Sequence, residues 1–146
     1  MEAMDNSEFV LSKLEAAIAS VKGIDLGAVL VSGILGLVTV VLALAAILPP
    51  SILILIRFLL LLATVVAVLL AYLGIRQLVQ NRSERLGILR KWHEEIFFAR
   101  TRVDSFEEGK IRKMVDFIQS IEDMHFSKPS NPRYKQLDIE FMKMLE

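Results

Sequence analysis

Apolar residues dominate the middle of the chain, and Arg57 is the one charged residue between positions 26 and 75. The Pro49–Pro50 pair divides this stretch, because two prolines cannot continue a helix. Each part supplies the roughly 20 apolar residues that a membrane-spanning helix needs. The pattern therefore predicts an all-α protein with two transmembrane helices, at about 26–48 and 51–75, joined by a tight hairpin.

The N-terminal arm repeats the helical rhythm on a smaller scale. Its apolar residues recur at helical spacing, at Val10, Leu14, Ala17, Ile18 and Val21. Asp5 with Glu8 resembles a capping box, and Gly23 is a plausible stop. The arm is predicted to form an amphipathic helix along the inner membrane surface. A partly ordered tail is the alternative.

The C-terminal part is predicted to form three amphipathic helices. Apolar residues at alternating spacings of three and four continue the second span into the first of them, at Ile75, Val79, Leu86, Leu89, Ile96 and Val103. Asp104, with Glu107, is predicted to cap the second helix, and Asn131 with Pro132 to start the third. The expected organisation is an interfacial helix at 1–24, a transmembrane hairpin at 25–75 and a cytoplasmic three-helix domain at 76–146.

Charge sets the expected orientation, although the formal net charge is zero. Between Arg76 and Arg102 there are seven basic and three acidic residues. Basic residues near a span stay on the cytoplasmic side. We therefore expect an integral protein of the plasma (inner) membrane with both termini in the cytoplasm.

Small residues recur four apart in each span and would face each other in a hairpin. They are Ala28, Ser32 and Gly36 in the first span, and Ala63, Ala67 and Ala71 in the second. Small residues let helix backbones approach closely in lipid, so the two stripes predict a packing seam. Chance is the alternative, since these residues are common in membrane helices. Gly27 and Gly33 lie off the stripe, where they would serve a contact between subunits.

Arg57 has two interpretations. Its position is about 9 Å from the expected hairpin tip at 1.5 Å per residue. Its long side chain can snorkel to headgroup phosphates. Alternatively, one arginine per subunit would line the outer mouth of an oligomeric pore and select anions. Leu42 is its expected neighbour in the first span.

No recognisable catalytic motif occurs in the chain. His93 and His125 are the only histidines, there is no cysteine, and "HEEIF" lacks the second histidine of a zinc protease helix. Arg85 and His93 are also too far apart for the arginine–histidine signature of HEPN ribonucleases. We expect no enzymatic activity, no metal and no cofactor.

Three basic residues of the first cytoplasmic helix fall on its inward-facing seam, namely Arg82, His93 and Arg100. With Trp92 they are candidate contacts for a lipid headgroup or for a phosphate-bearing ligand such as a nucleotide. The indole of Trp92 would stack on a base, although core packing is its commoner role. The expected partners are lipid, further copies of the chain and this anionic ligand, with no duplex nucleic acid.

An amphipathic helix, two spans joined by almost no loop and a cytoplasmic helical extension resemble the two-transmembrane effectors of prokaryotic nucleotide-signalled defence. These include SLATT-type proteins and the small membrane effectors of CRISPR and CBASS signalling. The resemblance lies in the architecture and includes no diagnostic motif. It implies a nucleotide messenger as the trigger. Separately, "KGIDLGAVLVSGILG" followed by "ILPP" resembles the first span of large-conductance mechanosensitive channels.

Two functions remain open from the sequence. The first is a homo-oligomeric pore or membrane-disrupting assembly, regulated by its cytoplasmic helices and acting in antiviral defence. The second is a non-conducting membrane-anchored scaffold that recruits a protein partner. Conductance distinguishes the two.

Overall fold

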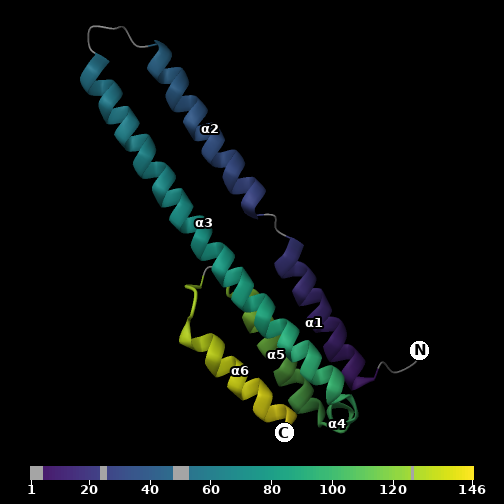
Figure 1. The fold of residues 1–146 in the computed structure, drawn as a ribbon. Helices are drawn as coiled ribbons and strands as arrows, with labels where there is room; N and C mark the ends of the chain where they lie inside the picture. Colours follow the sequence, from purple (N-terminus) through teal and green to yellow (C-terminus); the bar gives the residue numbers. More distant parts are fainter. Residues whose placement is uncertain (1–4, 24–25, 48–52, 126) are drawn as a thin grey trace. The chain divides into compact units, whose positions relative to one another are not determined.

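The computed structural model describes residues 5–23, 26–47, 53–125 and 127–146, with the side chains of 26–30, 44–47 and 53 excluded. These ranges contain helices and no strand, so the predicted all-α class is confirmed (Figure 1). The helices are α1 (Asn6–Gly23), α2 (Leu26–Ile47), α3 (Leu53–Phe98), α4 (Arg100–Asp104), α5 (Glu108–Asp123) and α6 (Pro132–Leu145). The Pro49–Pro50 turn of the expected hairpin lies outside the described residues.

The chain divides into two compact units. The first, here called the helical domain, combines Met1–Ile24 with Leu78–Glu146. The second, here called the apolar unit, is Asp25–Gln77 and contains α2 and the start of α3. The sequence led us to expect a domain from residue 76 onward, whereas the structure also places the N-terminal helix in that domain.

Helix α3 runs without a break from Leu53 to Phe98, through Gly87. The prediction that the helix beginning near residue 51 continues past residue 75 is therefore confirmed. The sequence predicted that it would extend to Val103, but it ends at Phe98. A short helix, α4, follows Ala99 and leads into the turn before α5.

The helical domain has a continuous apolar core. In it, α1 contacts α5 and α4, and α5 contacts α6, while α3 passes among these helices (Figure 1). Trp92 of α3 is fully buried and stacks on Phe141 of α6, with ring centroids 4.0 Å apart. Leu89, Ile96 and Val103 are fully buried too. Burial of each such side chain contributes about 1.5–3 kcal/mol to folding.

Local capping explains where α6 starts, but not where α5 starts. The Asn131 side chain accepts a hydrogen bond from the Arg133 amide at 3.0 Å, and Pro132 is the first helical residue, as predicted. The predicted cap at Asp104 is wrong. Helix α5 begins after Glu107, whose side chain makes no capping bond, and the Asp104 carboxylate instead accepts from the amide of Ser7 at 2.9 Å.

The apolar face of α1 is covered by protein. Val10, Leu14, Ala17 and Val21 are at most 5% exposed and belong to the core of the helical domain. The helix begins immediately after Asp5, close to the predicted position. We expected this face to lie against lipid. The structure gives it a different partner, because the surface formed by α5 and α4 offers the same apolar burial.

Candidate functional site

The apolar unit exposes large hydrophobic side chains along both of its helices. Ile54 is 89% exposed, Leu55 72% and Leu42 65%. Within the described residues, one helix, Ile54–Phe98, is long and apolar enough to cross a membrane by length and composition, and none of its most apolar window is buried. Val31–Ala43 of α2 is a shorter apolar segment. Contiguous apolar surface of this kind marks an interaction with a membrane or a partner.

The partly buried positions of the apolar unit recur every three or four residues along each helix. On α2 they are Ile34, Val38 and Val41, and on α3 they are Ile56, Leu60, Thr64, Ala67, Ala71 and Ile75. This spacing places them on one face of each helix. The two helices of the unit therefore meet through medium-sized aliphatic side chains as well as small ones.

The predicted small-residue seam corresponds only in part to this face. Ala67 and Ala71 are partly buried, whereas Ser32, Gly36 and Ala63 are exposed. A Cβ atom built at Gly36 would meet nothing within 4 Å, so no close helix approach occurs there. The reason is that Val38, Val41 and Leu60 occupy the face between the helices (the side chain of Ala28 lies outside the described residues).

Arg57 lies in a groove between α2 and α3. The groove has a volume of about 290 Å³ and is otherwise lined by Val38, Val41, Leu42, Leu60, Leu61, Thr64 and Val65. Leu42 is thus a neighbour of Arg57, as the antiparallel register predicted. No carboxylate lines this groove. An uncompensated guanidinium in an apolar setting is costly unless lipid phosphate, water or another subunit supplies its counter-charge.

The two threonines of the apolar unit satisfy their hydroxyls internally. Thr39 donates to the carbonyl of Leu35, and Thr64 donates to the carbonyl of Leu60, both at 2.7 Å. Such bonds to the preceding turn let a hydroxyl sit in an apolar helix without an external partner. Thr39 is exposed and Thr64 is partly buried.

The three basic residues predicted on the inward seam all contact α1. Arg100 donates to Ser7 Oγ at 3.2 Å and also pairs with Glu8. The imidazole Nε2 of His93 lies 3.5 Å from Glu15 Oε1. The structure therefore brings these candidates together along one helix, but it gives them protein partners.

Arg82 makes the third of these contacts. Its guanidinium donates to the carbonyl of Lys22, in the last turn of α1. Basic groups at a helix C-terminus satisfy its free carbonyls and interact favourably with the helix dipole. The fourth candidate, Trp92, is a core residue whose indole N–H donates to Asp138 Oδ1 at 2.9 Å. It is not available to stack on a ligand.

A second cavity adjoins α1 and includes His93. It measures about 370 Å³, and its lining residues are Glu15, Ile18, Ala19, Lys22, Arg90, His93 and Glu94. The formal charges of its two carboxylates, Glu15 and Glu94, cancel those of Lys22 and Arg90, with the third basic group, His93, counted as neutral. This balance does not favour an anion, which a nucleotide site would have to bind.

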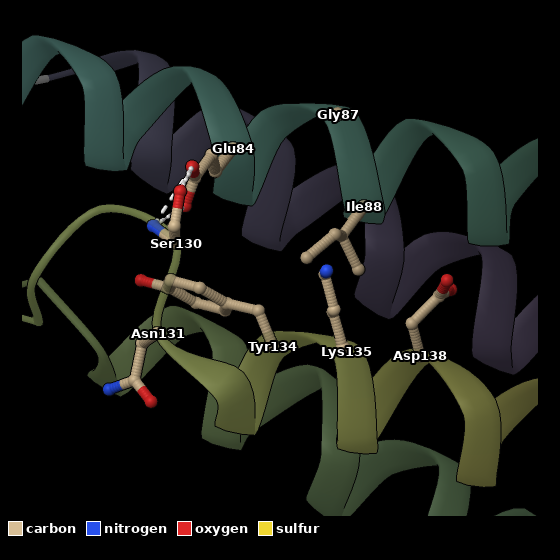
Figure 2. Close-up of a pocket in the computed structure, with 8 residues that line it drawn as sticks. All are labelled: Glu84, Gly87, Ile88, Ser130, Asn131, Tyr134, Lys135 and Asp138. Atoms are coloured by element: carbon tan, nitrogen blue, oxygen red, sulfur yellow. Dashed lines mark hydrogen bonds between the residues drawn. The ribbon is translucent and has the colours of Figure 1, made fainter.

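A further cavity of about 370 Å³ lies between α3 and α6 (Figure 2). It is lined by Glu84, Gly87, Ile88, Ser130, Asn131, Tyr134, Lys135 and Asp138. Its two carboxylates are engaged. Glu84 accepts from the Ser130 amide at 2.7 Å, and Asp138 accepts from Lys91 at 2.7 Å as well as from Trp92. The Glu84 contact holds Ser130 in a left-handed conformation with φ of 58°, which a non-glycine residue rarely adopts.

A buried polar network, which the sequence did not reveal, closes the end of α5. Asn81 donates to the carbonyls of Met124 and His125 at 3.0 and 2.8 Å. Arg85 donates to the carbonyl of Glu122 at 2.9 Å, and its Nη1 lies 3.0 Å from His125 Nδ1. Asn81 and Arg85 lie four residues apart on the face that carries Leu89, and that spacing was the available signal.

Tyr134 completes this network by donating to Asn81 Oδ1, with a second contact to the Met124 carbonyl at 3.3 Å. Burial raises the pKa of Tyr134, and it lowers the pKa of Arg85. Both shifts disfavour the charged form of the group. The phenol is therefore neutral at neutral pH, whereas the guanidinium stays charged because its ordinary pKa is far higher. The network caps a helix end.

Among the described residues, no group of three or more histidine, aspartate or glutamate side chains is placed to hold a metal ion. Comparisons of the chain with protein-family models, with curated proteins and with solved structures found no match. The site therefore has to be interpreted from its own geometry.

Proposed function

We propose that this chain is an integral membrane protein, with α2 and the start of α3 forming a transmembrane hairpin. The observation that carries the proposal is the apolar surface of Ile54–Phe98, whose most apolar window contains no buried residue. In water such a surface would drive aggregation, whereas a bilayer solvates it. The basic residues that follow, from Arg76 onward, favour a cytoplasmic position for the helical domain and for both termini.

In this proposal several copies assemble into a pore or membrane-disrupting structure. One hairpin supplies two helices, which cannot enclose a lumen, so conduction requires several subunits. The exposed small residues Ser32, Gly33 and Gly36 provide a surface suited to close contact between subunits. Arg57 then lies either among lipid phosphates or in the lumen.

The helical domain would control the assembly. By resemblance to nucleotide-signalled defence effectors, its trigger would be a nucleotide messenger. Arg82, His93 and Arg100 are occupied by α1, so such a ligand would have to displace α1 to reach them. We propose no enzymatic activity.

A non-conducting scaffold is the second candidate, and one observation favours it. The helical domain exposes apolar side chains that its core does not use. Phe98 is 82% exposed, Phe97 58% and Ile139 56%, and the two phenylalanines contact edge to face. Exposed aromatic residues of this kind are typical anchors for a protein partner.

Reconstitution tests these two functions. Purified full-length protein would be placed in liposomes loaded with a self-quenching dye, and its subunit number measured by mass in detergent. The pore proposal expects an oligomer and dye release above that of protein-free liposomes. A monomer or dimer that releases no dye with any nucleotide tested would favour the scaffold.

Membrane insertion needs its own control. Leu61→Asp/Leu69→Asp places two charges on the exposed apolar surface, each costing about 2.5–3.5 kcal/mol near the centre of a spanning helix. This variant should be lost from the alkali-resistant membrane fraction. Ile139→Asp/Phe98→Asp makes the same change on the helical domain and should remain in the membrane.

A further inference from the structure

We infer that α1 is a detachable helix, whose apolar face packs either on α5 and α4 or on the surface of the bilayer. The inference rests on the proposed membrane function and deepens it, since it names the element through which the helical domain would regulate the spans. It is carried by the contacts of α1 alone, all of which lie within the helical domain.

The apolar face of α1 is suited to either partner. Its four core residues form one narrow stripe at Val10, Leu14, Ala17 and Val21. Leu11 and Ile18 flank this stripe and are partly buried. The opposite face is exposed and carries Phe9, Ser12, Ala16 and Ala19, and all four charged residues of α1 lie outside the stripe. An amphipathic helix with such a stripe gains apolar burial whether it lies in a protein groove or at the lipid–water boundary.

Polar contacts hold the N-terminal end of α1. The Ser7 amide, which has no partner within its own helix, donates to Asp104 Oδ1 at 2.9 Å. Arg100 donates to Ser7 Oγ at 3.2 Å and pairs with Glu8. Arg100 and Asp104 are the first and last residues of α4, a helix of five residues. We call this group of contacts the clasp.

Two further contacts follow along α1, the His93–Glu15 pair and the Arg82–Lys22 bond. The ion pairs of α1 are open to solvent. The Arg100 and Glu8 side chains are 44% and 54% exposed, and that of Glu15 is 71% exposed. Exposed pairs contribute little to stability, so they position α1 without fixing it. Most of the attachment of α1 comes instead from its apolar face, so α1 can leave α5 and α4 only where a second apolar surface covers that face.

Chain connectivity makes the bilayer surface the alternative partner. Helix α1 ends at Gly23 and α2 begins at Leu26, so α1 cannot move far from the apolar unit. Two glutamates and two lysines leave α1 without net charge. Its partitioning would therefore depend on apolar area, and it should be similar for phosphatidylcholine and phosphatidylglycerol bilayers.

Thiol chemistry on the full chain in liposomes tests the inference, because the chain has no native cysteine. Ala17→Cys reports the buried face, and its neighbour Ala16→Cys is the exposed control. Each is combined with Arg100→Ala/Asp104→Ala, which removes the clasp. The matched control is Glu108→Ala/Arg112→Ala, which removes an exposed ion pair on α5 instead. Modification is followed with a membrane-permeant maleimide and with a charged thiosulfonate.

With the clasp intact, the thiol of Ala17→Cys should react at least about tenfold more slowly than that of Ala16→Cys with both reagents. Removing the clasp should raise the rate at which the permeant reagent modifies position 17 about tenfold. The rate of the charged reagent should rise far less, because lipid then covers the apolar face of α1. Equal acceleration of both reagents would mean release into water and would overturn the inference. No acceleration, or the same acceleration from the α5 control, would overturn it too. Unchanged Trp92 fluorescence confirms that the domain stays folded.

A cross-link tests the regulatory part. Glu15→Cys/His93→Cys would be joined by a short reducible bifunctional thiol reagent, which locks α1 in place. Locking should lower dye release several-fold, and reduction should restore it. Equal release from linked and reduced protein would overturn the regulatory role. If no variant releases dye, the pore proposal fails, but the thiol reaction rates of Ala17→Cys still decide whether α1 moves to lipid.

Discussion

Buried polar side chains of the helical domain are used to end helices. Asn81 and Arg85 of α3 donate to three carbonyls at the end of α5, which the helix itself leaves free. Tyr134 of α6 fixes the orientation of Asn81 by donating to its Oδ1. The network thus joins three helices at one point, and each member depends on the others.

Replacing Tyr134 by phenylalanine tests this dependence. Tyr134→Phe keeps the ring but leaves the buried Oδ1 of Asn81 without its donor, which should lower the free energy of unfolding by about 1–3 kcal/mol. Trp92, the single tryptophan, is fully buried and reports unfolding of the helical domain by fluorescence. Tyr72→Phe, at an exposed tyrosine of the apolar unit, is the control and should change nothing. Equal stability of both variants would show that the network does not support the fold.

The carboxyl groups of Asp5 and Asp104 interact at the start of α1. Their mutual hydrogen bond is the main cause that raises the pKa of Asp5, with burial and the repulsion of Asp104 adding to it. The same bond is the main cause that lowers the pKa of Asp104, helped by Ser7 and Arg100. Between the lowered and the raised pKa the pair therefore binds one proton, preferentially on Asp5. Glu8 and Arg100 are the other charged groups that act on Asp5.

The sign of the pH dependence follows from these shifts. Asp5, with a raised pKa, stabilises the fold below its ordinary value of 3.8, and this contribution is lost as pH rises through the raised pKa. Asp104, with a lowered pKa, stabilises above 3.8 and loses its contribution as pH falls. The contact should be strongest near 3.8 and weaken towards neutral pH, where two carboxylates face each other.

Asp5→Asn should abolish the loss of stability towards neutral pH, because the amide donates to Asp104 at any pH and caps α1 equally well. The midpoint of denaturant unfolding would be compared with that of the parent from the ordinary carboxyl pKa of 3.8 up to neutral pH, the side on which the raised pKa of Asp5 places the release of the shared proton. Asp116→Asn, at a position of α5 remote from this pair in sequence, is the matched control and should follow the parent. An Asp5→Asn profile parallel to the parent would refute the shared proton.

At the scale of elements, helices whose signals are local could be predicted from the sequence. Asn131 and Pro132 start α6, and the apolar rhythm past residue 75 is matched by the unbroken α3. The position of α1 could not be predicted, because amphipathicity specifies an apolar face and not what covers it. The prediction that Asp104 caps α5 was wrong for a related reason. Its carboxylate caps a helix distant in sequence, to which no local pattern points.

The contact between α2 and α3 also depends on partners distant in sequence. Leu60→Ala, on the partly buried face, should destabilise the apolar unit by about 1 kcal/mol, less than for a fully buried leucine. Leu62→Ala, at an exposed position of the same helix, is the control and should be nearly neutral. Gly36→Leu should be tolerated within one chain, because open space surrounds it. Thermal unfolding by circular dichroism measures all three.

Gly36→Leu also separates contacts within and between chains. A variant that unfolds like the parent but loses its oligomer would place the small residues of α2 at a subunit contact. A variant that unfolds at lower temperature would instead support the original seam, with Gly36 against the second span. Native mass measurement in detergent gives the subunit number in either case.

At the scale of the whole molecule, the two units match two different solvents. The helical domain buries most of its large apolar residues and carries nearly all charges of the described chain, whereas the apolar unit exposes most of its hydrophobic side chains. One helix, α3, contributes to both units. This contrast is expected for a membrane protein with an aqueous domain, since each environment hides a different kind of surface.

The proposed membrane topology can be tested in intact cells. A cysteine introduced at position 51 should be labelled from outside by an impermeant thiol reagent, and a cysteine added after Glu146 should not. The lack of native cysteines gives a clean background for both. Labelling of the C-terminal cysteine from outside would contradict the orientation inferred from Arg76 and the basic residues that follow it.

Arg57 links the residue scale to the function of the assembly. In a conducting oligomer with Arg57 in the lumen, Arg57→Glu should reverse or abolish anion preference, because a ring of charges at a constriction changes sign. Arg57→Leu should reduce selectivity without harming insertion, since it makes the span more apolar. If Arg57 instead reaches lipid phosphates, Arg57→Lys and Arg57→Leu should conduct like the parent. Reversal potentials in a salt gradient measure this preference directly. An unchanged reversal potential in Arg57→Glu would exclude the arginine ring but not the pore, because exposed uncharged residues such as Thr39 could still line the lumen.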